Sequence, residues 1–245
     1  RDGRALPIDD SGAPIRDAAG QLLGVVLVFR DISERRVAEL ALRESEARFR
    51  TMADSAPVLI WVSDADALYT YFNQPWLEFT GRALEHELGY GWADGLHPDD
   101  HARALEAYRS AFAAREPFTV ECRLRRADGS YRWVLDTGLP RWAPGGAFAG
   151  YIGSCVDITE RVFTERRLTA QYSIARILSE APTLAEASPQ ILQTIGETLA
   201  WDWGALWMLD RDDGLLRCVE IWHAPGIDAH ALSEASWRIR FGYGQ

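Results

Sequence analysis

Two clusters near the middle of the chain combine carboxylates with imidazole, a pairing that is common in acid–base catalysis. Residues 85–87 read Glu-His-Glu, and residues 99–101 read Asp-Asp-His. No nucleophile or oxyanion site accompanies either cluster in the sequence. We therefore predict that both clusters are solvated helix termini and that the chain contains no catalytic residues.

His97 and His101 are four residues apart, a spacing that would place two ligands on one face of a helix. Haem iron is the candidate metal, because a histidine often supplies its axial ligand. Pro98 disfavours helical backbone at the residue before it, so His97 is not expected to share a helical face with His101. The sequence disfavours haem, and the identity of any cofactor stays open.

Charge and cysteine content narrow the function classes further. The net charge is −10 and all 26 basic residues are scattered arginines, so we predict no nucleic-acid surface. Cys122, Cys155 and Cys218 are odd in number and widely separated, which fits neither a disulfide framework nor a metal site. The longest apolar run is too short to span a bilayer. A reducing, cytoplasmic location is predicted.

The ends of the chain suggest a piece of a longer protein. It opens on Arg1 without an initiating Met and stops in the glycine-rich stretch 242–245. Its 245 residues suit about one and a half to two ordinary domains. A membrane anchor upstream of Arg1 therefore stays open.

An internal repeat organises the first two thirds of the chain. A shift of 126 residues places Asp31–Arg35 onto Asp157–Arg161 without a gap. Asp-Gly predicts a tight hairpin turn, and later Gly and Pro predict the next reversal, so each copy is expected to be a β-meander. The aligned turn residues are Asp2-Gly3 with Asp128-Gly129, Asp10 with Asp136, Gly12 with Gly138, Pro14 with Pro140, Gly20 with Gly146, and Gly24 with Gly150.

Alternation of apolar and polar residues predicts the strands. Residues 118, 120, 122 and 124 are apolar and their neighbours are polar, a period of two that buries one face of a strand. The predicted elements, in chain order, are strands 58–62 and 69–72, helix 74–80, a longer helix after Pro98, and strands 118–125, 130–137 and 148–158.

Two polar helices are predicted directly after the copies of the repeat, at 33–54 and 160–179. Val37, Leu40 and Ala47 lie at near-heptad spacing in the first, and Leu168 and Tyr172 belong to a less regular series in the second. Solvated connecting helices and parallel dimeric coiled coils both fit this pattern.

Beyond Pro182 the pattern changes to an amphipathic helix and two strands. The helix is predicted at 184–199, and the strands at 203–209 and 215–222 are separated by an Arg-Asp-Asp-Gly turn. This order indicates the opening half of another α/β domain.

Residues 44–165 resemble a PAS domain with its C-terminal PAC motif. The resemblance rests on His97-Pro98-Asp99-Asp100, Arg123-Leu124-Arg125-Arg126, Asp128-Gly129, Arg132-Trp133 and Asp157-Ile158-Thr159-Glu160-Arg161. It implies an α+β PAS fold, which is a five-stranded antiparallel sheet with helices on one side.

The resemblance also implies a domain order, in which the ends of the chain are incomplete domains. The C-terminal part resembles the start of a GAF domain, of the α/β class. The order is 1–36 as the C-terminal strands of a preceding PAS/PAC domain, 37–54 as a helical linker, 55–161 as the PAS/PAC domain, 162–180 as a second helical linker, and 181–245 as the N-terminal part of a GAF-like domain.

Aromatic residues are the candidates for a ligand pocket in the implied fold, where they would lie on or near the inner face of the sheet. Core packing is the alternative. Asn73 is also expected to hold the turn into the following helix through backbone hydrogen bonds. The pocket candidates are Trp61, Phe72, Asn73, Trp76, Phe79 and Trp92.

The triplet Asp157, Ile158 and Thr159 lies where the last strand is expected to become the outgoing helix. Asp and Thr can cap a helix and bond local backbone. By resemblance, the triplet couples movement of the sheet to the linker, with Asp157 paired to Arg132. The equivalent triplet of the first copy is Asp31, Ile32 and Ser33.

The resemblance implies a sensory module that binds a small ligand or a partner and signals through helical linkers, as a homodimer, to a downstream effector. A histidine kinase is the expected effector, and a cyclic-diguanylate enzyme is the alternative. A ligand-free dimerisation spacer is the other alternative. Flavin is disfavoured because the photoreceptor motif Gly-x-Asn-Cys has no counterpart between Gly81 and Pro98.

Overall fold

The computed structural model describes residues 6–242, so the predicted turn at Asp2-Gly3 lies outside the described residues. The chain forms two compact units. The first runs to residue 120 and also includes 125–130 and 136–155. The second consists of 121–124, 131–135 and the residues from 156 onward.

A two-stranded hairpin and a long helix come first in the chain. Strands β1 (Ile8–Arg16) and β2 (Leu22–Asp31) pair antiparallel, with Ile8 opposite Asp31. The Asp17 carboxylate accepts hydrogen bonds from the amides of Ala19 and Gln21 and so holds the turn. Helix α1 (Ser33–Ser55) follows directly. The apolar side chains of β2 are largely exposed.

A five-stranded antiparallel sheet follows α1 in the chain, and its connecting helices confirm the predicted α+β class. The strand order across the sheet is β4-β3-β7-β6-β5. Trp61 of β3 lies opposite Phe72 of β4 and Gly153 of β7. The strands are β3 (Leu59–Ser63), β4 (Tyr69–Phe72), β5 (Phe118–Arg125), β6 (Tyr131–Trp142) and β7 (Phe148–Asp157).

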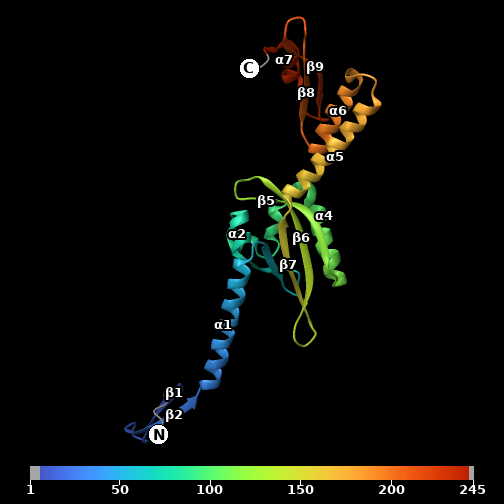
Figure 1. Cartoon of the computed structure of the whole chain (residues 1–245). Coiled ribbons are helices and arrows are strands. Elements are labelled where there is room, and N and C mark those ends of the chain that lie inside the picture. The colour runs from blue at the N-terminus through green and yellow to red at the C-terminus, as the bar shows by residue number, and fades with distance from the viewer. Residues whose placement is uncertain (1–5, 243–245) are drawn as a thin grey trace. The chain divides into compact units, whose positions relative to one another are not determined.

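Four helical segments connect β4 to β5 (Figure 1): α2 (Gln74–Thr80), α3 (Leu84–Glu87), η1 (Gly91–Gly95) and α4 (Pro98–Ala114). Asn73 caps α2, and Gly81 ends it with a positive φ of 66° that favours glycine. Pro98 occupies the first turn of α4, where its missing N–H is tolerated.

Strand β6 is longer than predicted, because Gly138 and Pro140 do not form a turn. Both residues lie inside the strand, which continues to Trp142, and the chain reverses only at 143–147. A Cβ atom at Gly138 would lie 2.2 Å from the ring of Phe118. Gly138 therefore makes room for a core aromatic side chain, and the prediction of a reversal there was wrong. Gly12 and Pro14 likewise lie inside β1.

The C-terminal part contains two packed helices and a three-stranded sheet. Helices α5 (Thr159–Glu180) and α6 (Leu184–Leu199) lie side by side (Figure 1). Thr183 and Glu186 form a reciprocal capping box at the start of α6. The sheet has the order β10-β9-β8, and the remaining elements are β8 (Trp203–Leu209), β9 (Leu215–His223), α7 (His230–Arg238) and β10 (Arg240–Gly242).

Candidate functional site

The inner face of the five-stranded sheet is filled by aromatic side chains that contact one another. The ring centroid of Trp61 lies 4.6 Å from Tyr69, 6.1 Å from Tyr108 of α4 and 6.1 Å from Phe118. Tyr69 in turn lies 4.8 Å from Trp92. Four of the predicted pocket residues, Trp61, Phe72, Trp76 and Trp92, are buried in this layer, and Phe79 is half-buried.

Glycine at position 153 makes space for the largest of these rings. A Cβ atom there would lie 2.2 Å from Cζ2 of Trp61 and 2.7 Å from the Thr137 carbonyl oxygen. Any side chain at 153 would therefore displace Trp61, because neither a buried ring nor a backbone carbonyl can give way easily.

Asp136 is buried within this layer and was not among the predicted site residues. Its carboxylate accepts a hydrogen bond of 2.8 Å from Nε1 of Trp61. Burial raises the pKa of Asp136 to about 6, against the hydrogen bonds from Trp61 and the Cys155 thiol, which lower it. Asp136 lies two residues after buried Val134, so strand alternation could have placed it on the inner face.

Asn73 uses its whole side chain to tie backbone segments together. Its Nδ2 atom donates to the carbonyl oxygens of Ala53 (2.8 Å) and Val58 (2.9 Å). Its Oδ1 atom accepts from the amides of Ile60 (2.8 Å) and Trp76 (3.2 Å). Asn73 therefore connects the end of α1 to β3 and α2 from a fully buried position. It contacts backbone throughout, as the turn-holding prediction proposed.

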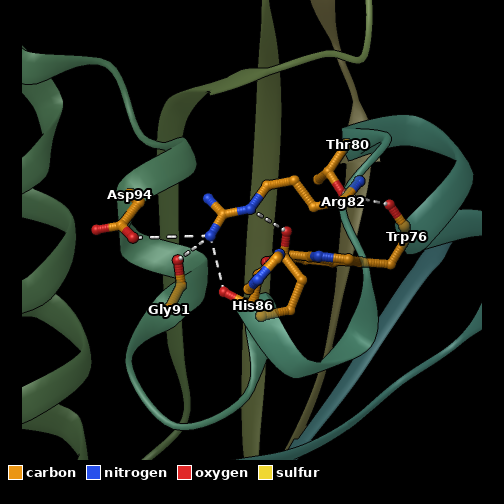
Figure 2. A network of polar contacts seen from close by, with 7 residues as sticks. Trp76, Thr80, Arg82, His86, Gly91 and Asp94 are labelled. Atoms are coloured by element: carbon orange, nitrogen blue, oxygen red, sulfur yellow. Dashed lines mark hydrogen bonds and ion pairs between the residues drawn. The ribbon is translucent and has the colours of Figure 1, made fainter.

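A polar network around Arg82 joins α3 and η1 (Figure 2). The guanidinium donates to the carbonyl oxygens of His86 (2.7 Å) and Gly91 (3.2 Å). It also pairs with Glu87, whose side chain is only 1% exposed, at 3.1 Å, and with Asp94 at 3.6 Å. This network fixes a loop that carries Trp92 onto the sheet.

Two indole groups in this layer are buried without a hydrogen-bond acceptor. Nε1 of Trp76 and Nε1 of Trp92 find none among residues 6–242. Buried donors of this kind usually find a partner in proteins, so these two indoles are exceptions. The buried carboxylate oxygens of Glu87 also make no hydrogen bond among the described residues, although Glu87 forms the ion pair with Arg82.

The histidine and carboxylate clusters considered first lie at helix ends, as predicted, but they are not fully solvated, because Glu87 and Asp100 are buried. His97 precedes α4, and its Nδ1 atom accepts from the Asp99 amide at 3.3 Å. His86 is exposed at the end of α3. Within the described part of the chain, no group of three or more His, Cys, Asp or Glu side chains is arranged to hold a metal ion.

The predicted relay triplet lies at the junction between β7 and α5. Oδ1 of Asp157 accepts from the amide of Thr159 at 2.9 Å. The Thr159 hydroxyl oxygen accepts from the amide of Trp133 at 2.9 Å, and the Ile158 amide donates to the Trp133 carbonyl at 2.8 Å. The start of α5 is thus bonded to β6 through both backbone groups of Trp133.

Arg132, the predicted partner of Asp157, does not share this bonding. Between residues 6 and 242, no ion pair joins Arg132 to Asp157, whose carboxylate instead serves the Thr159 amide. The residue that contacts the triplet is Trp133. It belongs to the Arg-Trp motif but was not singled out as a site residue.

The first copy of the repeat has the same backbone bonds. Oδ1 of Asp31 accepts from the Ser33 amide at 2.8 Å, and the Ile32 amide donates to the Pro7 carbonyl at 3.1 Å. The Ser33 hydroxyl and amide lower the pKa of Asp31. Residue 7 is proline and has no N–H, so Ser33 cannot receive the bond that Thr159 receives.

The central part of the chain matches a known family. Residues 69–155 match the family model described as the PAS fold. This segment is a PAS domain. The match covers the chain from β4 to residue 155 of β7 with the helices between them. It includes Asp136 and the aromatic residues of these elements, whereas Trp61 of β3 precedes it.

Two curated relatives are similar to this chain over part of their length. The uncharacterized protein y4lL of Sinorhizobium fredii is 45% identical over 156 residues, which cover 63% of this chain and 19% of y4lL. The peroxide stress-activated histidine kinase mak1 of Schizosaccharomyces pombe is 26% identical over 179 residues, covering 63% of this chain and 10% of mak1. The chain thus spans at most about a fifth of the length of these two relatives. Matches in sensor kinases point to a role in sensory signal transduction.

A crystal structure of a sensory box histidine kinase/response regulator from Burkholderia thailandensis is also similar. It is 27% identical, with a TM-score of 0.41, over 53% of this chain and 98% of that chain. No helix among residues 6–242 of the present chain has the length and apolar character needed to cross a membrane.

Proposed function

We propose that the PAS domain senses a small ligand or a partner and passes the resulting change through α5 to an effector. The observation that carries this proposal is the bonding of Thr159 and Ile158 to Trp133, because it attaches the outgoing helix directly to a strand of the sensing sheet. A shift of β6 would then move the start of α5. A relay of this kind needs an element with two arrangements, and we assign that role to the junction.

The ligand is a small polar molecule with hydrogen-bond acceptors. The support comes from Trp76 and Trp92, whose buried indole N–H groups find no acceptor among the described residues. A ligand acceptor group beside either indole would satisfy a donor whose burial is otherwise costly, by about 1–3 kcal/mol.

A ligand-free dimerisation spacer is the second candidate. It is favoured by the mutual contacts of the inner aromatic rings, which pack Trp61 against Tyr69, Tyr108 and Phe118. A core that is filled by its own side chains has no need of a ligand.

Dimerisation through the linker helices is part of the proposal. Val37 and Leu40 of α1 are 67% and 63% exposed, and Leu168 and Tyr172 of α5 are 60% and 75% exposed. Apolar side chains along a helix are stabilised when a second helix covers them, and the partner would be a second copy of the chain.

The array around the sensor follows the repeat. We assign 1–36 to a preceding PAS/PAC domain, 37–54 and 162–180 to linkers, 55–161 to the sensor itself and 181–245 to a GAF-like domain. A histidine kinase is the proposed effector, because mak1 is a histidine kinase and shares this region.

Native mass spectrometry with an absorption spectrum tests the proposal on the 245-residue chain. We expect a dimer that carries a reproducible extra mass, and we expect Trp76→Phe and Trp92→Phe to lose that mass. Trp142→Phe, at a half-exposed indole, is the matched control. A dimer without extra mass would favour the spacer, and a monomer would contradict the proposed linker contacts.

A further inference from the structure

Trp133 is contacted by two cations where α5 begins. The guanidinium carbon of Arg123, from β5, lies 5.3 Å from the centroid of the Trp133 ring. The guanidinium carbon of Arg166, from α5, also lies 5.3 Å from it. Both distances are within the roughly 6 Å at which a cation is attracted to an aromatic face. We call these three residues the tryptophan clamp.

The clamp adds a second point of attachment to the helix. The bonds of Ile158 and Thr159 fix where α5 begins, but a helix attached only at its first turn can still tilt. Arg166 lies seven residues beyond Thr159, close to two full turns, so both residues are on the same face of α5. Two attachments on one face fix the direction of the α5 axis, whereas a single attachment fixes only the position of its first turn.

A second contact connects α5 to the neighbouring strand. Arg161, in the first turn of α5, forms an ion pair with Glu121 of β5. Both partners are about half exposed, so this pair is expected to contribute little by itself. Its geometry agrees with that of the clamp, because Glu121 and Arg123 belong to the same strand.

We propose that Trp133 is a positioning residue, and that its contact with Arg166 sets the direction of α5 relative to β6. This inference rests on the proposed relay function and assigns its mechanical element. The backbone groups of Trp133 bond to the start of α5, and its ring contacts Arg166 in the clamp. One residue therefore transmits movement of β6 to two points of the helix that are about two turns apart.

Amide hydrogen exchange on the 245-residue chain tests the inference, because it resolves α5 from α6 in one sample. Arg166→Met keeps the length of the side chain but removes the charge, and we expect it to speed exchange in 159–167 by roughly two- to five-fold, the loss of one cation–π contact. Arg166→Lys should restore most of the protection. Trp133→Leu keeps the backbone bonds but loses both cation contacts, and should speed exchange by more than Arg166→Met.

Arg167→Met is the matched control, since Arg167 is the next residue on the helix and, within the described part of the chain, makes no cation–π contact with the Trp133 ring. Exchange in 184–199 should stay unchanged in all variants. Equal effects of Arg166→Met and Arg167→Met would overturn the inference, as would failure of lysine to restore protection. The exchange measurement needs no ligand and no effector. If native mass spectrometry finds no bound mass, the role of Trp133 and Arg166 can therefore still be tested.

Discussion

The two copies of the repeat begin their outgoing helices with the same backbone bonds. The Ile32 amide donates to the carbonyl of Pro7, and the Ile158 amide donates to the carbonyl of Trp133. The Asp31 carboxylate accepts from the Ser33 amide, and the Asp157 carboxylate accepts in the same way from the Thr159 amide. These bonds need only the Asp-Ile-Ser/Thr triplet and a partner strand. The repeated triplet therefore fixes where each helix begins.

The side chains around the two junctions differ. Trp133 of the second copy is replaced by Pro7 in the first, which has neither an amide donor nor an aromatic ring, and Arg166 is replaced by Leu40. The second junction is therefore held by a hydroxyl bond and a clamp that the first lacks. A motif repeated within one chain can thus position a helix without determining how firmly that helix is held.

Substitutions at equivalent positions should differ most in their effect on stability at Gly153, whose equivalent in the first copy is Leu27. We expect Gly153→Ala to lower the free energy of unfolding by about 3 kcal/mol, because the new methyl group would displace Trp61 and strain its bond to Asp136. Leu27→Ala is the control and should change it by less than about 1 kcal/mol, since Leu27 is 57% exposed. Urea unfolding of the 245-residue chain measures both. A tolerated Gly153→Ala would contradict the described packing.

The next difference is between Asp136, which is buried, and Asp10, its exposed equivalent. The folded-state pKa of Asp136, about 6, lies above its ordinary value of 3.8, so the folded chain favours the protonated form. The free energy of unfolding should therefore rise as the pH falls from 8 through 6 towards 4.

Asp136→Asn should remove this pH dependence, because asparagine stays neutral. We expect it to raise the free energy of unfolding at pH 8 by on the order of 1–3 kcal/mol and to change it little near pH 4. Unfolding curves at the two pH values check this, with Asp10→Asn as the control. Equal effects of Asp136→Asn at both pH values would show that the carboxyl does not titrate as described.

The smallest expected difference in stability effect concerns the hydroxyl groups of Thr159 and Ser33 at the two junctions. Thr159→Val keeps the shape of the side chain but leaves the Trp133 amide without its acceptor, and we expect a loss of about 1–2 kcal/mol in thermal or urea unfolding. Ser33→Ala should have a smaller effect, because Pro7 has no amide to lose and, among the described residues, the Ser33 hydroxyl interacts only with the exposed Asp31 carboxylate. Similar losses in the two variants would mean that the Trp133 bond does not distinguish the copies.

Most elements of the fold could be predicted from periodicity alone. Strand 69–72, helices 74–80 and 184–199, and strand 203–209 were predicted with the bounds that the structure has. Period and turn chemistry are local, so the sequence suffices for them. Strand β6 was cut short because Gly138 looks like a turn residue, and only the position of Phe118 across the sheet reveals its packing role.

The candidate site was less predictable than the fold. The Asp-Ile-Thr triplet at the start of α5 was singled out because it repeats, and Asn73 because it follows a strand. Asp136, Trp133 and Arg166 were missed, since their roles depend on which strands and helix lie side by side, and no short spacing records that. Whether Trp61 lines a pocket or fills a core likewise depends on Gly153, which is 92 residues away.

Because α5 is long, a small tilt at its first turn produces a larger displacement at its other end. With 22 residues rising 1.5 Å each, the helix is about 33 Å long. A tilt of about 5° at Thr159 would displace the far end by roughly 3 Å, close to the width of one methyl group and enough to change which side chains meet there. A small rotation at the Trp133 junction can thus leave the sheet almost unchanged and still alter which residues lie next to Glu180 at the other end of α5.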